Sequence, residues 1–376
     1  MKIIADHYIP FLKGVLEPKA EVVYANGSDI IASQISDANA LLIRTRTFCT
    51  PSLLENSKVR FIGTATIGTD HIDKDFCHLN NIEVVSAPGC NSASVAHYVA
   101  SALFWYAKNQ NVDLSRLCIG VIGAGNIGSK VIDFCRALGM NVLVNDPPRA
   151  RLESEFIMHS IDEICEMADI ITFHVPLIKN GNLKTRHLAD TAFFSKLKSA
   201  QLVINTSRGE VIESSALKSH LNSNPHFNAI IDVWENEPFP DEDLINCCYI
   251  ATPHIAGYSQ DGKANGTAAV VRALSEHFEL GLDSWYPENI PFNLNSEITM
   301  DAKNSDLINI LELFYLYTYP IFEDSERFKS RISDFELLRG NYPIRRDPSY
   351  YTLNLLNTGQ KLLEVIKKIN IRLKNQ

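Results

Sequence analysis

The sequence predicts an α/β protein with two doubly wound parallel-sheet domains and a smaller C-terminal α+β domain. Short apolar runs typical of strands recur along the first 255 residues and alternate with stretches of helical periodicity, which is the pattern of parallel sheets with helical crossovers. The runs are almost continuously apolar, as expected for strands that are covered on both faces. They are too numerous for one such sheet, so we expect two.

Length and composition agree with this architecture. The 376 residues exceed the roughly 250–300 residues at which single cores stop growing, so we expect two or three domains. The net charge of −9 argues against a nucleic-acid partner, which would favour a basic surface. The N-terminal stretch lacks the apolar core of a signal peptide, no apolar run approaches the ~20 residues of a membrane span, and none of the eight cysteines forms a Cys-x-x-Cys pair. We expect a cytoplasmic protein that does not bind membranes.

The first predicted domain consists of residues 1–91 and 257–285. Its strands are expected at 2–6, 40–44, 60–64 and 82–86. A long helix at 92–110 then leads into the second domain. A second helix at 266–281 is expected to return to the first domain.

The second predicted domain spans residues 92–256. Its strands are expected at 118–122, 141–145, 170–174, 202–206, 229–233 and 249–252. Beyond residue 285 the regular alternation is lost, and we expect a third domain at 286–376 with helices at 305–319 and 353–374.

A glycine-rich turn follows the run at 118–122. Gly123, Gly125 and Gly128 have G-x-G-x-x-G spacing, a helical stretch follows, and Asp146 ends the next strand. Such a turn alone is weak support, but in this context it predicts a dinucleotide site with the pyrophosphate at the helix N-terminus. Asp146 would accept hydrogen bonds from ribose hydroxyls and repel a 2′-phosphate, which favours NAD over NADP. Arg149 leaves the opposite choice open, since an arginine there can pair with a phosphate.

Three later segments place ionisable residues just after predicted strands. Arg208 follows the run at 202–206, Asp232 and Glu237 follow 229–231, and His254 follows 249–252. Ligands of open α/β sheets bind beyond the carboxyl ends of the strands, so these side chains should meet near a bound dinucleotide. A histidine suits proton transfer, a nearby carboxylate favours its charged form, and a guanidinium binds a carboxylate or polarises a carbonyl. Each residue alone is more often a surface or structural group.

Five segments in order, GAGNIGSK, FHVPL, NTSRGEVI, DVWENEP and TPHIAG, resemble the D-isomer-specific 2-hydroxyacid dehydrogenase family. The resemblance covers residues 1 to about 285. It implies a Rossmann NAD-binding domain at 92–256, a substrate-binding domain formed by 1–91 and 257–285, and Arg208, Glu237 and His254 as catalytic residues with His254 as the acid/base. The residues that it places around NAD are Gly123, Gly125, Asn126, Ile127, Gly128, Asp146, Val175, Thr206, Ser207, Arg208, Asp232 and Gly257.

Further segments, including FIGTATIGTDHID, SAPGCN and HIAGYSQDGKANGT, resemble the members of this family that oxidise a small phosphorylated 2-hydroxy acid. Arg44 and Arg46, which we expect to share one face of an extended segment, form a candidate phosphate fork. The alternative is that they pair with surface carboxylates. Thr45, Thr66 and Tyr258 are further candidates for substrate binding. Arg345 and Arg346 could reach an active site across a dimer interface.

The resemblance also implies a homodimer held by residues 286–376. Two other functions stay open from the sequence: oxidation of another substrate such as 3-phosphoglycerate, and an NAD-sensing scaffold without enzymatic activity. The eleven histidines contain no i, i+4 pair, so we expect no metal site.

Overall fold

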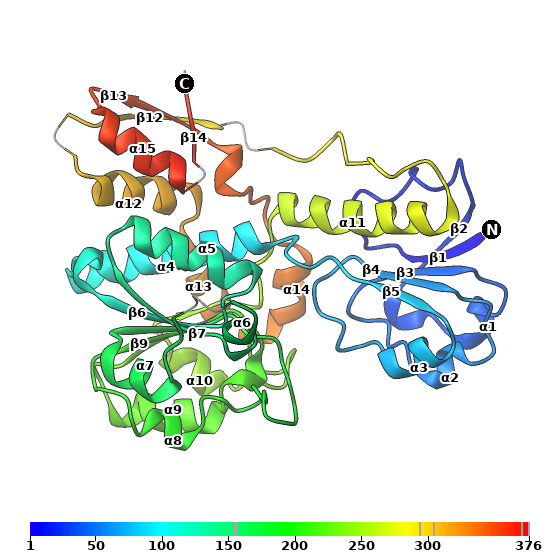
Figure 1. Cartoon of the computed structure of the whole chain (residues 1–376), viewed down its shortest axis with the longest axis horizontal. Helices are drawn as coiled ribbons and strands as arrows, with labels where there is room; N and C mark the ends of the chain where they lie inside the picture. Colours follow the sequence, from blue (N-terminus) through cyan, green and yellow to red (C-terminus); the bar gives the residue numbers. More distant parts are fainter. Residues whose placement is uncertain (154–156, 293–294, 304, 370, 375–376) are drawn as a thin grey trace. The chain divides into compact units, whose positions relative to one another are not determined.

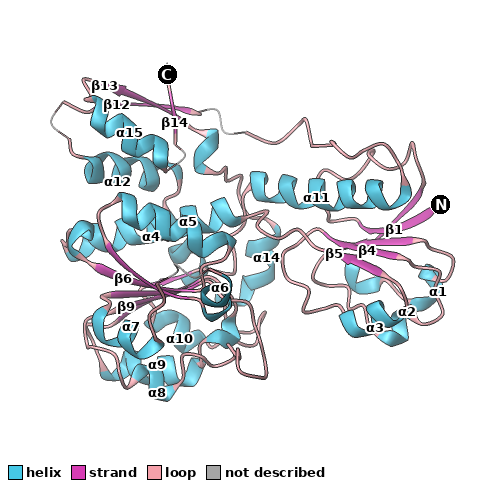
Figure 2. Cartoon of the chain, in the orientation of Figure 1, coloured by secondary structure: helices cyan, strands magenta, loops and turns pink. Residues whose placement is uncertain are grey.

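The structure, a computed structural model, describes residues 1–153, 157–292, 295–303, 305–369 and 371–374. The chain divides into two compact units. One comprises Met1–Asn91 and Ser259–Phe292, and the other comprises Ser92–Tyr258 and Asn293–Gln376. Figures 1 and 2 show the order and type of the elements, with helices and strands alternating along most of the chain. Within the described residues, no helix has the length and apolar character needed to cross a membrane.

The first unit contains a five-stranded parallel sheet with the order β2-β1-β3-β4-β5. Its strands are β1 (Lys2–Asp6), β2 (Glu21–Ala25), β3 (Ala40–Ile43), β4 (Phe61–Thr64) and β5 (Glu83–Val85). Neighbouring strand residues point to opposite faces: Ile4 packs with Ile35, whereas Ile3 packs with Val270. The two faces are covered by α1 (Ala32–Ile35), α2 (Pro51–Leu54) and α3 (Lys74–Leu79) on one side and by α11 (Gln260–Phe278) on the other (Figure 1).

The second unit contains a six-stranded parallel sheet with the order β11-β10-β9-β8-β6-β7. Its strands are β6 (Cys118–Ile122), β7 (Asn141–Asn145), β8 (Ile170–Phe173), β9 (Leu202–Asn205), β10 (Asn228–Ile231) and β11 (Ile250–Ala251). Helices α4 (Ser92–Gln110) and α5 (Asn126–Ala137) cover one face. The other face packs against α7 (Ile161–Met167), α9 (Ser214–Ser223) and α10 (Glu242–Cys247) (Figure 1). All strands run the same way, so their carboxyl ends share one edge.

The C-terminal segment of the second unit has its own small sheet. The strands β12 (Glu297–Asp301), β13 (Thr352–Leu356) and β14 (Arg372–Leu373) are parallel. Its helices are α12 (Leu307–Thr318), α13 (Ile321–Lys329), α14 (Phe335–Gly340) and α15 (Gln360–Lys368). Trp105 of α4 stacks on Phe322 of α13 with ring centroids 4.4 Å apart. The hydroxyl of Ser325 accepts a hydrogen bond from Ala251 N–H at 3.1 Å, so α13 covers the edge strand β11.

The fold class predicted from sequence is confirmed, and each of the ten predicted runs overlaps a strand. Strand β2 was missed because it lies at the edge of its sheet and alternates between exposed and half-buried residues. The helix predicted for 353–374 is confirmed only over α15, because β13 and β14 occupy the two ends of that stretch. Helix α11 begins earlier than predicted because the Ser259 hydroxyl caps it, accepting the Gly262 N–H at 2.8 Å.

Candidate active site

The glycine-rich turn between β6 and α5 is built by close backbone contacts. Gly123 has φ +93°, and a Cβ there would lie 2.5 Å from the carbonyl oxygen of His174. A Cβ on Gly128 would overlap the carbonyl oxygen of Gly123. Both positions therefore require glycine. Gly125 differs, because a Cβ there would meet no atom within 4 Å, so the turn leaves open space next to its backbone.

This open space lies at the start of α5. Gly125 is the cap residue, and Asn126, Ile127 and Gly128 form the first helical turn. The N–H groups of a first turn have no partner within the helix and carry a partial positive charge. Gly125 and Asn126 are exposed and Ile127 is half-buried. Their backbone donors and the space beside Gly125 fit the pyrophosphate of a dinucleotide.

Asp146 follows β7 and touches the same turn. One of its carboxylate oxygens accepts the Ala124 N–H at 2.7 Å, and the other caps α6 (Pro147–Leu152) by accepting the Arg149 N–H at 2.9 Å. The side chain of Arg149 pairs with Glu153 at 3.0 Å and donates to the Ala124 carbonyl at 3.1 Å. Arg149 is therefore held beside the turn by Glu153 and by the backbone of Ala124.

The ends of β8 and β9 flank the turn. Val175 is half-buried, and its Cγ1 would lie 2.9 Å from a Cβ on Gly123. His174 is 8% exposed, and burial lowers its pKa to about 3. The neutral ring bonds to the hydroxyls of Thr172 at 3.0 Å and Thr206 at 3.4 Å. Ser207 is buried and donates to the side-chain oxygen of Asn205 at 2.7 Å.

His254 and Glu237 meet at the carboxyl ends of β10 and β11. His254 Nδ1 lies 2.8 Å from Glu237 Oε2, and Glu237 Oε1 accepts the Trp234 N–H at 2.9 Å. Burial by itself would raise the pKa of Glu237, but His254 and these hydrogen bonds lower it below its usual value. A carboxylate on Nδ1 fixes the ring orientation and leaves Nε2 for proton exchange.

Asp232 holds the loop that carries His254. Its side chain is 1% exposed and accepts the Thr252 hydroxyl at 2.6 Å, the Ile255 N–H at 2.8 Å and the Ala256 N–H at 2.9 Å. Burial raises its pKa despite these bonds. Gly257 follows this loop directly and is half-buried. The contacts of Asp232 are therefore with the protein backbone and one hydroxyl of its own unit.

Arg208 lies on the neighbouring loop, after β9. Its guanidinium Nη1 donates to the Ser207 carbonyl at 2.8 Å. The next residue, Gly209, approaches Trp234 so closely that a Cβ would overlap the Trp234 backbone. This contact holds the Arg208 loop against the segment that leads to Glu237. The structure thus brings His254 and Glu237 into direct contact and Arg208 into the adjoining loop.

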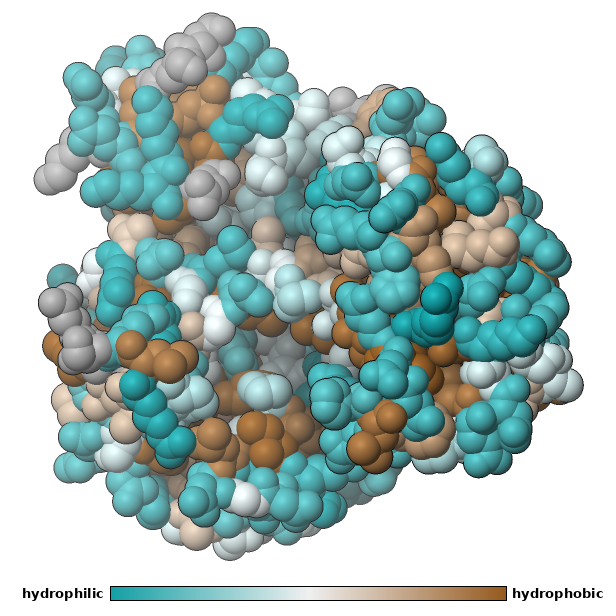
Figure 3. All heavy atoms as spheres, turned by 45° about the vertical axis from the view of Figure 1, so that its right-hand side comes forward, coloured by the Kyte–Doolittle hydropathy of each residue, from teal (hydrophilic) through white to brown (hydrophobic). Residues whose placement is uncertain are grey.

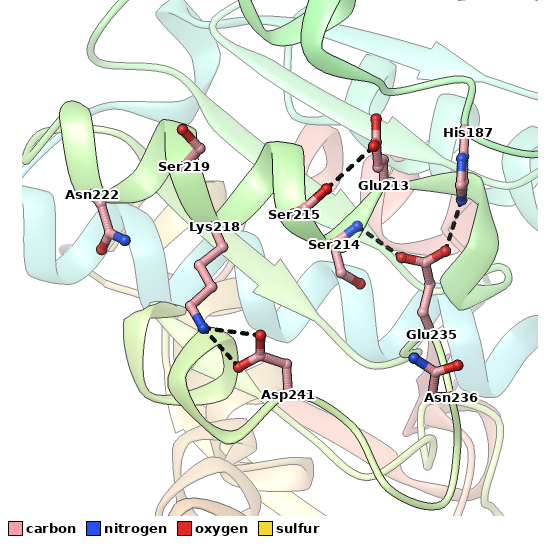
Figure 4. Close-up of a pocket in the computed structure, with 10 residues that line it drawn as sticks. All are labelled: His187, Glu213, Ser214, Ser215, Lys218, Ser219, Asn222, Glu235, Asn236 and Asp241. Carbon is pink, nitrogen blue, oxygen red and sulfur yellow. Dashed lines mark hydrogen bonds and ion pairs between the residues drawn. The ribbon is translucent and has the colours of Figure 1, made fainter.

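A close histidine–carboxylate pair does not by itself mark this site. His187 Nε2 lies 2.7 Å from Glu235, and His277 Nδ1 lies 2.6 Å from Glu83. Figure 4 shows His187 and Glu235 in a surface pocket beside Lys218, which pairs with Asp241 at 2.9 Å. None of the residues lining that pocket was predicted from sequence. The His254–Glu237 pair differs because His254 lies on the loop that follows β11.

The predicted phosphate fork in the first unit lies in a turn. Thr45 and Arg46 are exposed turn residues after β3, and Thr47 N–H donates to the Arg44 carbonyl at 3.4 Å. The expected extended segment is wrong because the chain reverses here, so alternation does not make the two arginines point the same way. Arg44 Nη1 donates to the Tyr8 carbonyl at 3.4 Å. Thr66, after β4, bonds to the Thr64 hydroxyl at 2.7 Å.

Sequence reasoning missed a C-terminal residue beside Tyr258. The guanidinium of Arg339, in α14, lies 5.5 Å from the Tyr258 ring centroid, and its charge helps lower the pKa of Glu237. No motif signalled this contact. Arg345 and Arg346 are 4% and 8% exposed and pack within their own chain, where Arg345 bonds to backbone carbonyls of the His254 loop and Arg346 lies over Tyr350.

Known proteins resemble this chain in sequence over most of its length. Residues 93–256 match the D-isomer specific 2-hydroxyacid dehydrogenase, NAD binding domain. The erythronate-4-phosphate dehydrogenase of Bacteroides thetaiotaomicron is 47% identical over 356 residues, covering 94% of this chain and 99% of the relative. The enzyme of the same name from Azotobacter vinelandii is 36% identical and covers 98% of this chain and 99% of its own length.

Solved structures of related dehydrogenases share the fold. D-Lactate dehydrogenase from Aquifex aeolicus, complexed with NAD and lactic acid, matches with a TM-score of 0.62 and 25% identity, covering 78% of this chain and 100% of its own. NAD-bound 3-phosphoglycerate dehydrogenase from Entamoeba histolytica matches with a TM-score of 0.63 and 25% identity, covering 78% and 98%. The chain therefore belongs to the erythronate-4-phosphate dehydrogenase family of NAD-dependent D-isomer-specific 2-hydroxyacid dehydrogenases.

Proposed function

We propose that this enzyme oxidises 4-phospho-D-erythronate to (R)-3-hydroxy-2-oxo-4-phosphobutanoate with NAD, a step in pyridoxal 5′-phosphate synthesis. The observation that carries the proposal is the His254–Glu237 contact of 2.8 Å beyond the strand ends of a sheet with an NAD turn. The near-full-length similarity to erythronate-4-phosphate dehydrogenases supports this substrate over 3-phosphoglycerate.

His254 is the acid/base of this reaction. During oxidation its Nε2 takes the proton of the substrate C2 hydroxyl as the carbonyl forms. NAD held at the turn between β6 and α5 would supply the acceptor for the hydride that leaves C2. Glu237 on Nδ1 holds the ring and stabilises the positive charge that the imidazole gains. In the reverse direction the same nitrogen returns the proton to the oxygen.

In this proposal, arginine side chains bind the carboxylate and the phosphate of the substrate. Arg208 binds the substrate carboxylate or the oxygen at C2, where a guanidinium provides two parallel donors. We propose that the first unit serves substrate binding, with Arg44 and Arg46 toward the phosphate and with Thr45 and Thr66 as hydroxyl donors. Tyr258 of the second unit adds another hydroxyl.

We further propose that the enzyme is a homodimer that is held together by its C-terminal segment. Apolar side chains reach the surface in separate patches (Figure 3). Leu313 and Tyr317 are 54% and 56% exposed and lie four residues apart on α12, so they share one helix face.

All eight cysteines are free thiols, which supports a reducing compartment, the cytoplasm.

The test is NAD reduction by the purified protein with 4-phosphoerythronate and, in parallel, with 3-phosphoglycerate. We expect turnover with the first and little with the second. His254→Ala should lower kcat by about 10²–10⁴-fold, the usual contribution of a general acid–base group. Preference for 3-phosphoglycerate would overturn the substrate, and full activity of His254→Ala would overturn the mechanism.

A further inference from the structure

The loop that carries His254 is held on two sides. Its N–H groups at Ile255 and Ala256 donate to the Asp232 carboxylate. The carbonyl groups of the same two residues accept hydrogen bonds from the Arg345 guanidinium, at 3.3 Å for Ile255. The backbone directly after the catalytic imidazole therefore lies between a buried anion and a buried cation.

Arg345 reaches this loop from the C-terminal segment and is fixed by its surroundings. Its Nη2 donates to the Ser94 carbonyl near the start of α4 at 3.1 Å, and its Cζ lies 4.4 Å from the Tyr319 ring centroid. The side chain is only 4% exposed. A guanidinium suits this place because its rigid fork of donors spans several carbonyls at once, whereas an ammonium places its three donors on one atom.

His254 requires such support. Its φ is +57°, in the left-handed region that residues with a Cβ rarely adopt. Such a conformation persists where the surroundings fix it, and it is common at active sites. The His254 N–H donates to the Asp232 carbonyl at 2.7 Å, so the contacts of Asp232 and Arg345 together fix the backbone that aims the imidazole at Glu237.

We propose that Arg345 is a positioning residue: by binding the carbonyls of Ile255 and Ala256 it holds His254 in the orientation that proton transfer needs. This proposal rests on the proposed function for its effect on turnover. It gives the C-terminal segment a role in catalysis within its own chain.

The first test compares Arg345→Met and Arg345→Lys with wild type. Displacing a catalytic group by about 1 Å can cost about 10²-fold in rate, so we expect kcat to fall by about 10–100-fold in both variants, with the Kd for NAD changed less than about twofold. The lysine variant keeps the charge but loses the fork. Wild-type kcat in Arg345→Lys would overturn the positioning role, as would an unchanged kcat in Arg345→Met.

Lys329→Met is the matched control. Lys329 also belongs to the C-terminal segment and donates to a backbone carbonyl of the second unit, that of Cys248 before β11. It does not contact the His254 loop. We expect Lys329→Met to lower Tm about as much as Arg345→Met does, while kcat stays near wild type. Equal losses of kcat in Lys329→Met and Arg345→Met would show that Arg345 acts through general stability, and the proposal would fail.

A second test needs neither substrate nor NAD. The rate at which diethyl pyrocarbonate modifies His254 is measured by peptide mass spectrometry in wild type, Arg345→Met, Lys329→Met and Glu237→Gln. We expect faster modification in Arg345→Met, approaching the Glu237→Gln rate, and the wild-type rate in Lys329→Met. An unchanged rate in Arg345→Met contradicts the proposal. Because this result is independent of turnover, failure of wild type to oxidise 4-phosphoerythronate would overturn the proposed function alone.

Discussion

Two histidine–glutamate pairs with almost the same nitrogen–oxygen distance lie in the second unit, although His254 is paired through Nδ1 and His187 through Nε2. The distances are 2.8 Å for His254–Glu237 and 2.7 Å for His187–Glu235, and all four side chains are partly exposed. In both glutamates burial raises the pKa, but hydrogen bonds and the histidine lower it overall. Distance, exposure and the direction of the glutamate pKa shift therefore do not distinguish the pairs. Their positions do, because only the first lies on the loop that follows β11 at the carboxyl edge of the sheet.

Glu237→Gln should lower kcat by at least about tenfold, since the imidazole loses the carboxylate that stabilises its charge, while Glu235→Gln should leave kcat near wild type. Both glutamates have folded-state pKa values below the ordinary 4.5. Their stabilising effect is thus present above about pH 4.5 and is lost as the pH falls through the folded-state pKa. Urea unfolding from pH 7 down to about pH 3 should show both variants approaching wild type at the acid end. Equal kcat losses would contradict the assignment.

Arg44→Ala should raise the KM for 4-phosphoerythronate far more than it lowers kcat, because a phosphate contact acts equally in the ground state and the transition state. Steady-state kinetics with NAD in excess measure both constants. Arg60→Ala is a control in the same unit: Arg60 lies 5.5 Å from the Phe278 ring centroid. An unchanged KM in Arg44→Ala would remove Arg44 from the phosphate site.

At the scale of elements, the glycines of the turn between β6 and α5 meet two different demands, close backbone packing and space for a ligand. Gly123 and Gly128 are required by backbone contacts inside the turn, whereas Gly125 borders open space. The same hexapeptide thus contains two glycines that the fold needs and one beside open space, which we assign to the ligand.

Gly125→Ala and Gly128→Ala separate these demands. Gly128→Ala should lower Tm by several degrees, since overpacking costs about 1–3 kcal/mol or more. Gly125→Ala should keep Tm near wild type but raise the KM for NAD, because the new methyl enters the space that we assign to the pyrophosphate. Thermal unfolding and NAD titration measure the two effects. A wild-type KM for NAD in Gly125→Ala would move the pyrophosphate elsewhere.

The type and burial of an element decide whether it can be predicted from the sequence. Strands that are buried on both faces were found because they form continuous apolar runs, as in Ala40–Ile43. Strand β2 escaped because none of its five residues is buried, so it forms no continuous run of core residues. The turn at Thr45–Arg46 escaped because arginine and threonine carry no turn signal of their own, so the chain reversal depends on packing around the end of β3.

At the scale of the whole molecule, we assign two separate tasks to the C-terminal segment. Through Arg339 and Arg345 it reaches Tyr258 and the His254 loop of its own chain. Through the exposed face of α12 it presents Leu313 and Tyr317, which we assign to the dimer.

The double variant Leu313→Glu, Tyr317→Glu should be monomeric, because it places two charges on the apolar face that a partner would bury. Light scattering after size-exclusion chromatography gives the mass. Leu79→Glu, at an exposed position of α3, should stay dimeric as the control. If the double variant keeps the mass of wild type, the α12 face is not the interface.

The sequence by itself determined the parallel α/β architecture, the NAD turn and the strand ends that carry Arg208, Glu237 and His254, because these depend on local properties: apolar periodicity, glycine spacing and the order of segments. Only the tertiary structure decided how the loop that carries His254 is held. Asp232 accepts hydrogen bonds from N–H groups of this loop, and Arg345 donates hydrogen bonds to its carbonyl groups. The hydrogen-bond partners of Asp232 and Arg345 in this loop are backbone groups. Backbone groups are the same in every sequence, so no residue pattern could reveal which of them a distant arginine would bind.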